Sequence, residues 1–154
     1  KQRANTADHL ASQIRCRGHR VLTVASTPVA AQRSEQARLD KLRALAPKAP
    51  WLTLVELHPR YINPSAGRFR WEVAVNVVIS AARPGATPTR SAFTLPALLT
   101  RSNQGAVDAI DAVRDELSDR VDQMVRRVVD AQDGLEDFLM NCWRRRPGER
   151  PCDR

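Results

Sequence analysis

An almost unbroken alternation of apolar and polar residues over 67–79, which read GRFRWEVAVNVVI, restricts this chain more than any other feature. Successive side chains of a β-strand point to opposite faces of a sheet. One face of a strand here would carry Phe69, Trp71, Val73, Val75, Val77 and Ile79. The other would carry Arg68, Arg70, Glu72, Ala74 and Asn76. The segment therefore predicts a strand with one side in a core and an arginine-bearing side that can contact a polar partner.

Two helices are predicted before that strand. The first spans 6–17, because Asn5 can cap its start and Gly18 can adopt the left-handed conformation that ends many helices. The second begins after Ser34, a good N-cap residue, and ends before Pro47, which cannot continue a helix. Leucines at helical spacing in the second segment indicate a buried stripe.

Three further runs rich in β-forming residues lie at 19–26, 51–61 and 90–100. The run at 51–61 begins with apolar residues on both faces, so we expect a central strand that is covered on both sides. The turn residues INPSAG join it to the alternating strand as an antiparallel hairpin. In the last run, Pro96 cannot donate a ladder hydrogen bond, which predicts an edge strand or a break near its end.

The longest predicted element is an amphipathic helix that begins after TRSNQG. Its apolar stripe consists of Ile110, Val113, Leu117, Val121, Met124 and Val128. The opposite side carries Asp108, Asp111, Asp115, Asp119 and Asp122. We interpret the acidic side as a solvated surface, with a Ca²⁺ site or a cationic partner as the alternative. The stripe lacks the closely spaced ligands around a glycine that a calcium loop uses.

Together these elements predict an α+β fold: one mostly antiparallel sheet of about four strands, helices packed against it, and a long amphipathic C-terminal helix. A chain of 154 residues has the size of one ordinary domain. We expect a single domain over 1–141, which includes a last helical stripe at 135–143, and a basic tail over 142–154 that contains two cysteines.

Positive charge is concentrated in the first two thirds of the chain and in the tail. Residues 1–105 contain 16 Lys or Arg and 5 Asp or Glu, residues 106–141 contain 4 and 10, and residues 142–154 contain 5 and 2. Of the 25 cations, 22 are Arg, which reflects either a GC-rich coding sequence or a need for planar guanidinium groups. The net charge of +8 favours nucleic acid, anionic lipid headgroups or an acidic protein, without choosing among them.

Cysteine usage leaves two interpretations open. Cys142 and Cys152 bracket a short tail that could close as a disulfide loop in an oxidising compartment, which leaves Cys16 unpaired. Reduced thiols throughout are the alternative. The chain has no apolar run of the roughly 18 to 20 residues that cross a bilayer, and its start at Lys1 is compatible with a removed targeting segment.

No segment has the signature of a catalytic, phosphate-binding or metal site. The serines lie outside any nucleophile elbow, the glycines form no phosphate loop, and no Cys/His spacing fits a metal. We interpret His9, His19 and His58 as surface or structural residues. Glu56 and Glu72 could face one another across the hairpin, but two carboxylates alone are a weak indication of a hydrolase. We therefore expect a protein that is not an enzyme and binds no cofactor or metal.

Nucleic acid binding is the alternative function. Phe69 and Trp71 adjoin Arg68 and Arg70 in the sequence, which are the ingredients of a sheet that stacks bases. The alternation, however, puts the aromatic residues on the apolar face and the arginines on the opposite one. The longest helix is also acidic where DNA would require cations. A basic nucleic-acid-binding domain is for these reasons our second interpretation.

The passage LDKLRALAPKAPWLTLVEL, followed by RFRWEVAVNVVIS, a further strand and an amphipathic helix, resembles a group of bacterial envelope modules. These are the amino-terminal domain of TolB, the curli secretion lipoprotein CsgG, the penicillin-binding-protein activator LpoB and the lipopolysaccharide-transport lipoprotein LptE. The resemblance covers about residues 6–130 and rests on element order and apolar pattern. It implies a non-catalytic accessory protein that faces the periplasm and is anchored at the outer membrane through a cysteine that this sequence does not contain.

Such domains usually begin with a strand before the first helix, and the present sequence departs from that pattern. A sheet edge left open in this way could be completed by another chain or by a second copy, which would give a homo-oligomer. We expect an envelope assembly or scaffolding module that binds an acidic protein or an anionic envelope component. The expected contact residues are Arg60, Arg68, Arg70, Arg144, Arg145 and Arg146.

Overall fold

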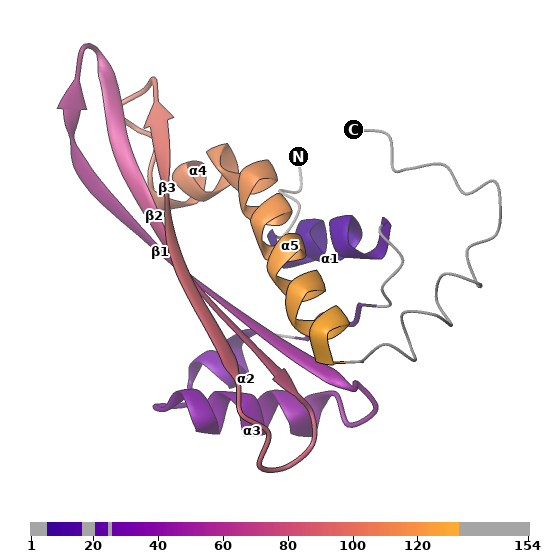
Figure 1. Ribbon diagram of the computed structural model, residues 1–154. Coiled ribbons are helices and arrows are strands. Elements are labelled where there is room, and N and C mark those ends of the chain that lie inside the picture. Colours follow the sequence, from indigo (N-terminus) through magenta and orange to yellow (C-terminus); the bar gives the residue numbers. More distant parts are fainter. Residues whose placement is uncertain (1–5, 17–20, 25, 133–154) are drawn as a thin grey trace, which may run out of the picture.

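The computed structural model describes residues 6–16, 21–24 and 26–132. Its elements are α1 (Thr6–Cys16), α2 (Ser26–Ala30), α3 (Glu35–Leu45), β1 (Trp51–Ser65), β2 (Arg68–Ala81), β3 (Thr89–Leu99), α4 (Ala106–Ala112) and α5 (Arg114–Gln132). The strands form one twisted antiparallel sheet, with α1, α4 and α5 on one side of it and α2 and α3 at one end of the other side (Figure 1). We call these sides the inner and the outer face. The α+β class predicted from the sequence is thus confirmed.

The sheet contains three strands in the order β1-β2-β3, rather than about four. The described part of the run at 19–26, residues 21–24, forms no strand: Val21 packs against the core and Leu22 is exposed. A β-forming composition does not make a strand without a neighbour to pair with. The prediction of a central position for 51–61 is also wrong, because β1 is an edge strand. The edge position that Pro96 indicates for β3 is confirmed.

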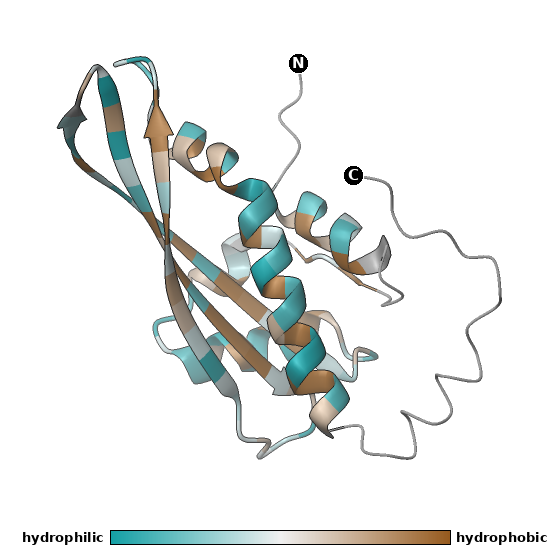
Figure 2. Ribbon diagram, turned by 45° about the horizontal axis from the view of Figure 1, so that its top comes forward, coloured by the Kyte–Doolittle hydropathy of each residue, from teal (hydrophilic) through white to brown (hydrophobic). Residues whose placement is uncertain are grey.

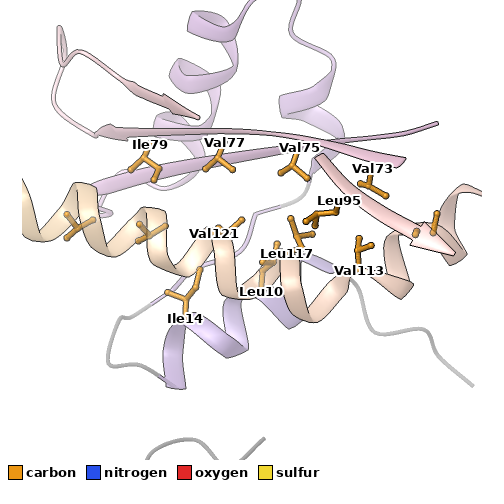
Figure 3. Close-up of a cluster of buried hydrophobic side chains, with 14 of the residues drawn as sticks. Leu10, Ile14, Val73, Val75, Val77, Ile79, Leu95, Val113, Leu117 and Val121 are labelled. Carbon is orange, nitrogen blue, oxygen red and sulfur yellow. The ribbon is translucent and has the colours of Figure 1, made fainter. Parts of the chain in front are cut away.

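The core lies between the inner face and the helices. In β2 the alternation places four consecutive odd positions inward, and Figure 3 shows them pointing toward α5 and toward Leu10 and Ile14 of α1. The buried residues that β2, β3 and α5 contribute to this cluster include Val73, Val75, Val77, Ile79, Leu95, Leu117 and Val121. The partly buried Trp71 packs against the same cluster. The inward apolar face predicted from GRFRWEVAVNVVI is therefore confirmed.

The predicted long helix is divided into α4 and α5, which meet at Val113. After this break the buried apolar positions of α5 are Leu117, Val121, Val125 and Val129, whereas Met124 and Val128 are only partly buried. Hydrophobic and hydrophilic bands alternate along α5, as they do in an amphipathic helix (Figure 2).

The interpretation of the acidic side of this helix as solvated is wrong for Asp122. Its side chain is 0% exposed and lies 3.1 Å from Nε of Arg126. α1 also packs against α5 and adds Leu10 and Ile14 to the core. Because α5 is covered by the sheet and by α1, fewer of its positions face solvent than a single-sided helix would expose.

The second of the helices predicted from the sequence is α3, and it begins where the sequence predicts. The hydroxyl of Ser34 accepts a hydrogen bond of 3.1 Å from the backbone N–H of Ala37, so that Ser34 caps α3. Leu39 and Leu42 are buried, while Leu45 is partly exposed at the end of the helix. α3 thus contributes a buried leucine stripe to the outer face of the sheet.

The helical stripe at 135–143, the tail, Cys142 and Cys152, and the arginines at 144–146 lie outside the described residues, and the division into a domain and a tail stays a prediction. Within 6–16, 21–24 and 26–132, none of the helices has the length and apolarity needed to span a bilayer.

Candidate interaction surface

A tight turn joins β1 to β2 next to the hairpin arginines. β1 continues through Ser65, which pairs with Arg68, so only Ala66 and Gly67 form the turn. Both have positive φ angles, 47° and 76°, as a two-residue hairpin turn of this hand requires. The turn is shorter than INPSAG predicts, and an alanine occupies its first left-handed position. The turn fixes the β1–β2 register, and the alternation along β2 points Arg68 and Arg70 to the outer face.

The outer face is uncovered at the hairpin end of the sheet. α2 and α3 lie at the opposite end, where β1 begins, and the hairpin extends beyond them (Figure 1). We call this uncovered area the arginine face and define it by Arg60, Arg68, Arg70, Glu72, Pro96 and Leu98. The structure therefore brings the three hairpin arginines of the sequence prediction together on one surface.

Positive charge exceeds negative charge on the arginine face. The Glu72 carboxylate lies 3.4 Å from a guanidinium nitrogen of Arg60 and 3.5 Å from one of Arg70, so that two arginines share one acid. Arg60 is 75% exposed and Arg70 is 48% exposed. Within the described part of the chain, Arg68 has no carboxylate within ion-pair distance. Contacts this long and exposed add little to folding stability.

Arginines at the helix-covered end of the outer face have different surroundings. Arg90 lies 2.6 Å from Glu35 of α3, and the hydrogen bond to that carboxylate, followed by charge attraction, raises the pKa of Arg90. Arg38 pairs with Glu56, and Arg43 donates a hydrogen bond of 2.6 Å to the carbonyl of residue 82. These arginines attach α3 to the sheet. The arginines of the hairpin have no such task.

A shallow hollow of about 590 Å³ lies between β2 and β3 on the arginine face. Its lining residues are Ala66, Arg68, Arg70, Pro96 and Leu98. Leu98 is 53% exposed, so its side chain forms an apolar part of this surface beside the two arginines. The hollow therefore offers guanidinium groups and an apolar wall to the same ligand.

The aromatic residues of the hairpin face the other way. Trp71 and Phe69 are partly buried against the inner core, and Tyr61 contacts Trp71 edge-on at 5.5 Å between ring centroids. Arg68 and Arg70 are on the opposite side of the same strand. The mixed arginine and aromatic surface that base stacking would need is not formed by these residues.

The remaining candidate groups are dispersed. Glu56 lies opposite Asn76 and Glu72 opposite Arg60, so that the two glutamates do not face one another. His9 of α1 lies 3.3 Å from Asp115 of α5, on the inner side, whereas His58 is exposed on β1. Among the residues that the structure describes, no three His, Cys, Asp or Glu side chains are grouped as metal ligands.

Pro96 and Leu98 were missed as surface residues by sequence reasoning, which identified the arginines alone. The signal was present, because the same alternation that places Leu95, Ala97 and Leu99 inward must place Pro96 and Leu98 outward. Their position beside Arg68 and Arg70 depends on the β2–β3 register.

Comparison of the chain with protein-family models, with curated proteins and with solved structures finds no match.

Proposed function

We propose that this protein is a non-catalytic assembly or scaffolding module whose arginine face binds an acidic partner. The observation that carries the proposal is the charge balance of that face. On an uncovered part of the sheet, Arg60 and Arg70 share the single carboxylate of Glu72, and Arg68 has no carboxylate within ion-pair distance among the described residues. A partner that brings carboxylates would supply the counter-charges that the fold itself leaves out, with planar geometry that suits guanidinium.

The setting of that partner is inferred from the resemblance described above. Envelope modules of the TolB, CsgG, LpoB and LptE type act as accessory proteins, which suggests an acidic envelope protein or another anionic envelope component. We place the protein in the periplasm, held at the outer membrane by an anchor outside this sequence. The three-stranded antiparallel sheet with a C-terminal helical layer is compatible with this class and does not by itself select it.

A charge-reversal experiment tests the binding function. The double variant Arg68→Glu/Arg70→Glu is compared with Arg33→Glu/Arg83→Glu, which changes two exposed arginines outside the arginine face and has the same net charge. The probe is fluorescent polyglutamate, followed by anisotropy at low and at physiological salt. Each reversal removes an attraction of about 0.5 kcal/mol and adds a repulsion of about 0.5 kcal/mol. The two reversals together cost about 2 kcal/mol of binding free energy, so the Arg68/Arg70 variant should bind about 30-fold more weakly.

The control variant should lose much less affinity, because its arginines are remote from the site. An equal loss in the two variants would show that net charge alone drives binding, and the proposed surface would then be wrong. The unfolding free energy of the Arg68/Arg70 variant should stay within about 0.5 kcal/mol of the parent, as expected for exposed positions.

Nucleic acid remains the second candidate, because the arginine face could contact phosphates without stacking any base. It predicts retention of mixed-sequence oligonucleotides that falls steeply with salt. Binding of polyglutamate without any retention of such oligonucleotides at low salt would exclude this candidate.

A further inference from the structure

The free edge of β3 is the more regular of the two sheet edges. β3 is 11 residues long and pairs with β2 on one side only, in a register without irregularities. β1, at the other edge, carries Pro59 and Pro64 and a bulge between Tyr61 and Asn63. Prolines and bulges hinder edge pairing, so β1, with two prolines and a bulge, is less suited to accept another strand than β3, which has one proline, Pro96, and no bulge.

Two hollows lie beside the last residues of β3, and Leu98 lines both of them. On the arginine face is the hollow of about 590 Å³ beside Arg68 and Arg70. A second hollow of about 410 Å³ lies between the end of β3 and α4. Its lining residues are Leu98, Leu99, Thr100, Gln104, Asp108, Asp111 and Ala112. A strand added to this edge would find room for its side chains beside both faces of the sheet.

We propose that an extended acidic segment of a partner protein pairs with the free edge of β3 as a fourth strand. This inference rests on the proposed function and specifies how the acidic partner binds. Alternate side chains of the added strand would lie over the arginine face. Arg70 on β2 is about 10 Å from that position, two strand spacings away, a distance that an arginine and a glutamate side chain can span together over Leu98.

The charges favour this occupant over a second copy of the chain. The protein carries a net charge of +8, and a second arginine face at the same edge would bring guanidinium groups together. The apolar wall formed by Pro96 and Leu98 favours a segment in which acidic residues are interspersed with apolar ones. Backbone pairing would supply affinity, and the hollow beside Arg68 and Arg70 would supply selectivity for acidic side chains, while the apolar side chains would face the second hollow, which Asp108 and Asp111 line in part.

The test uses the full chain and a soluble peptide that alternates glutamate with valine. Its matched control is the same peptide with methyl groups on alternate backbone nitrogens. This change keeps every charge and removes the N–H donors that would pair with β3. Strand pairing predicts that methylation weakens binding at least 10-fold. It also predicts that amide hydrogen exchange slows in β3 on addition of the unmodified peptide, and that the neutral substitution Leu98→Ser weakens binding through loss of the apolar wall.

The outcomes separate this inference from the proposed function. Equal binding of the methylated and unmodified peptides would overturn strand pairing while the acidic-partner function stands. Absence of binding by both peptides and by polyglutamate would overturn the two together. Tighter binding of an oligonucleotide than of the peptide, or dimerisation of the free protein that Leu98→Ser abolishes, would assign the edge to a different occupant and contradict the proposal.

Discussion

Two neighbouring leucines provide a direct test of the fold at the end of β3. Leu99 is 4% exposed and belongs to the core, whereas Leu98 is 53% exposed and lines the hollow on the arginine face. The substitutions Leu99→Ala and Leu98→Ala change the same chemistry at adjacent positions of one strand, so that differences in strand propensity cancel. Each variant is therefore the control for the other.

The expected free energies of unfolding differ by about 2 kcal/mol. Leu99→Ala should cost about 3 kcal/mol, because a buried leucine loses its transfer energy and leaves a cavity. Leu98→Ala should cost at most about 1 kcal/mol, since only about half of the side chain is removed from water and its hollow is open to solvent.

Urea unfolding followed by tryptophan fluorescence measures both values, with the denaturant slope checked for constancy. Equal losses for the two variants, or a larger loss for Leu98→Ala, would refute the assignment of faces on β3. The arginine face as defined here would then not exist, because Leu98 and the residues of β2 opposite it would belong to a core.

Three further results are expected from other parts of the chain. Ser34→Ala removes the N-cap of α3 and should lower the free energy of unfolding by about 1 kcal/mol in the same urea assay, and an unchanged value would contradict the capping role. Asp122→Ala should cost about 1 kcal/mol or more, because it removes a fully buried side chain and its contact with the 39% exposed Arg126, whereas Asp130→Ala at an exposed position should cost less than about 0.5 kcal/mol. Titration of free thiols without reductant should give one per chain if Cys142 and Cys152 are paired, and three would exclude that disulfide and argue against export.

The strands could be predicted because their two faces differ in polarity. In GRFRWEVAVNVVI the inward set and the outward set are each uniform enough to determine which face is buried, and Pro96 indicates an edge. The central position expected for 51–61 failed for a general reason: apolar residues on both faces show that both are covered, not that both edges are paired. At the start of β1 the core and α3 provide that cover, and Leu52 is buried.

The helices were harder to predict in detail. Val113 is neither a glycine nor a proline, so nothing in the local sequence signals the break between α4 and α5. Leu117 and Val121 are buried as predicted, but beyond them the buried stripe continues through Val125 and Val129 instead of Met124 and Val128. Asp122 is buried although a helical wheel places it on the acidic side, because a wheel contains no information about distant segments, such as α1, that pack against α5.

The candidate surface was predictable in its charges and not in its boundaries. The alternation fixes that Arg68 and Arg70 point away from the core. Two further features follow from the lengths and pairing of strands that are far apart in sequence. α2 and α3 leave the hairpin end uncovered, and Leu98 lies beside Arg70.

The most direct test of the binding surface is a map of where an acidic polymer binds. Backbone amide chemical shifts of the isotope-labelled protein would be followed while polyglutamate is added. The account predicts that the largest changes fall on the hairpin around Arg60, Arg68 and Arg70 and along β3, with small changes near Arg33 and Arg83. Changes spread evenly over all exposed arginines, or centred on the end covered by α3, would contradict it.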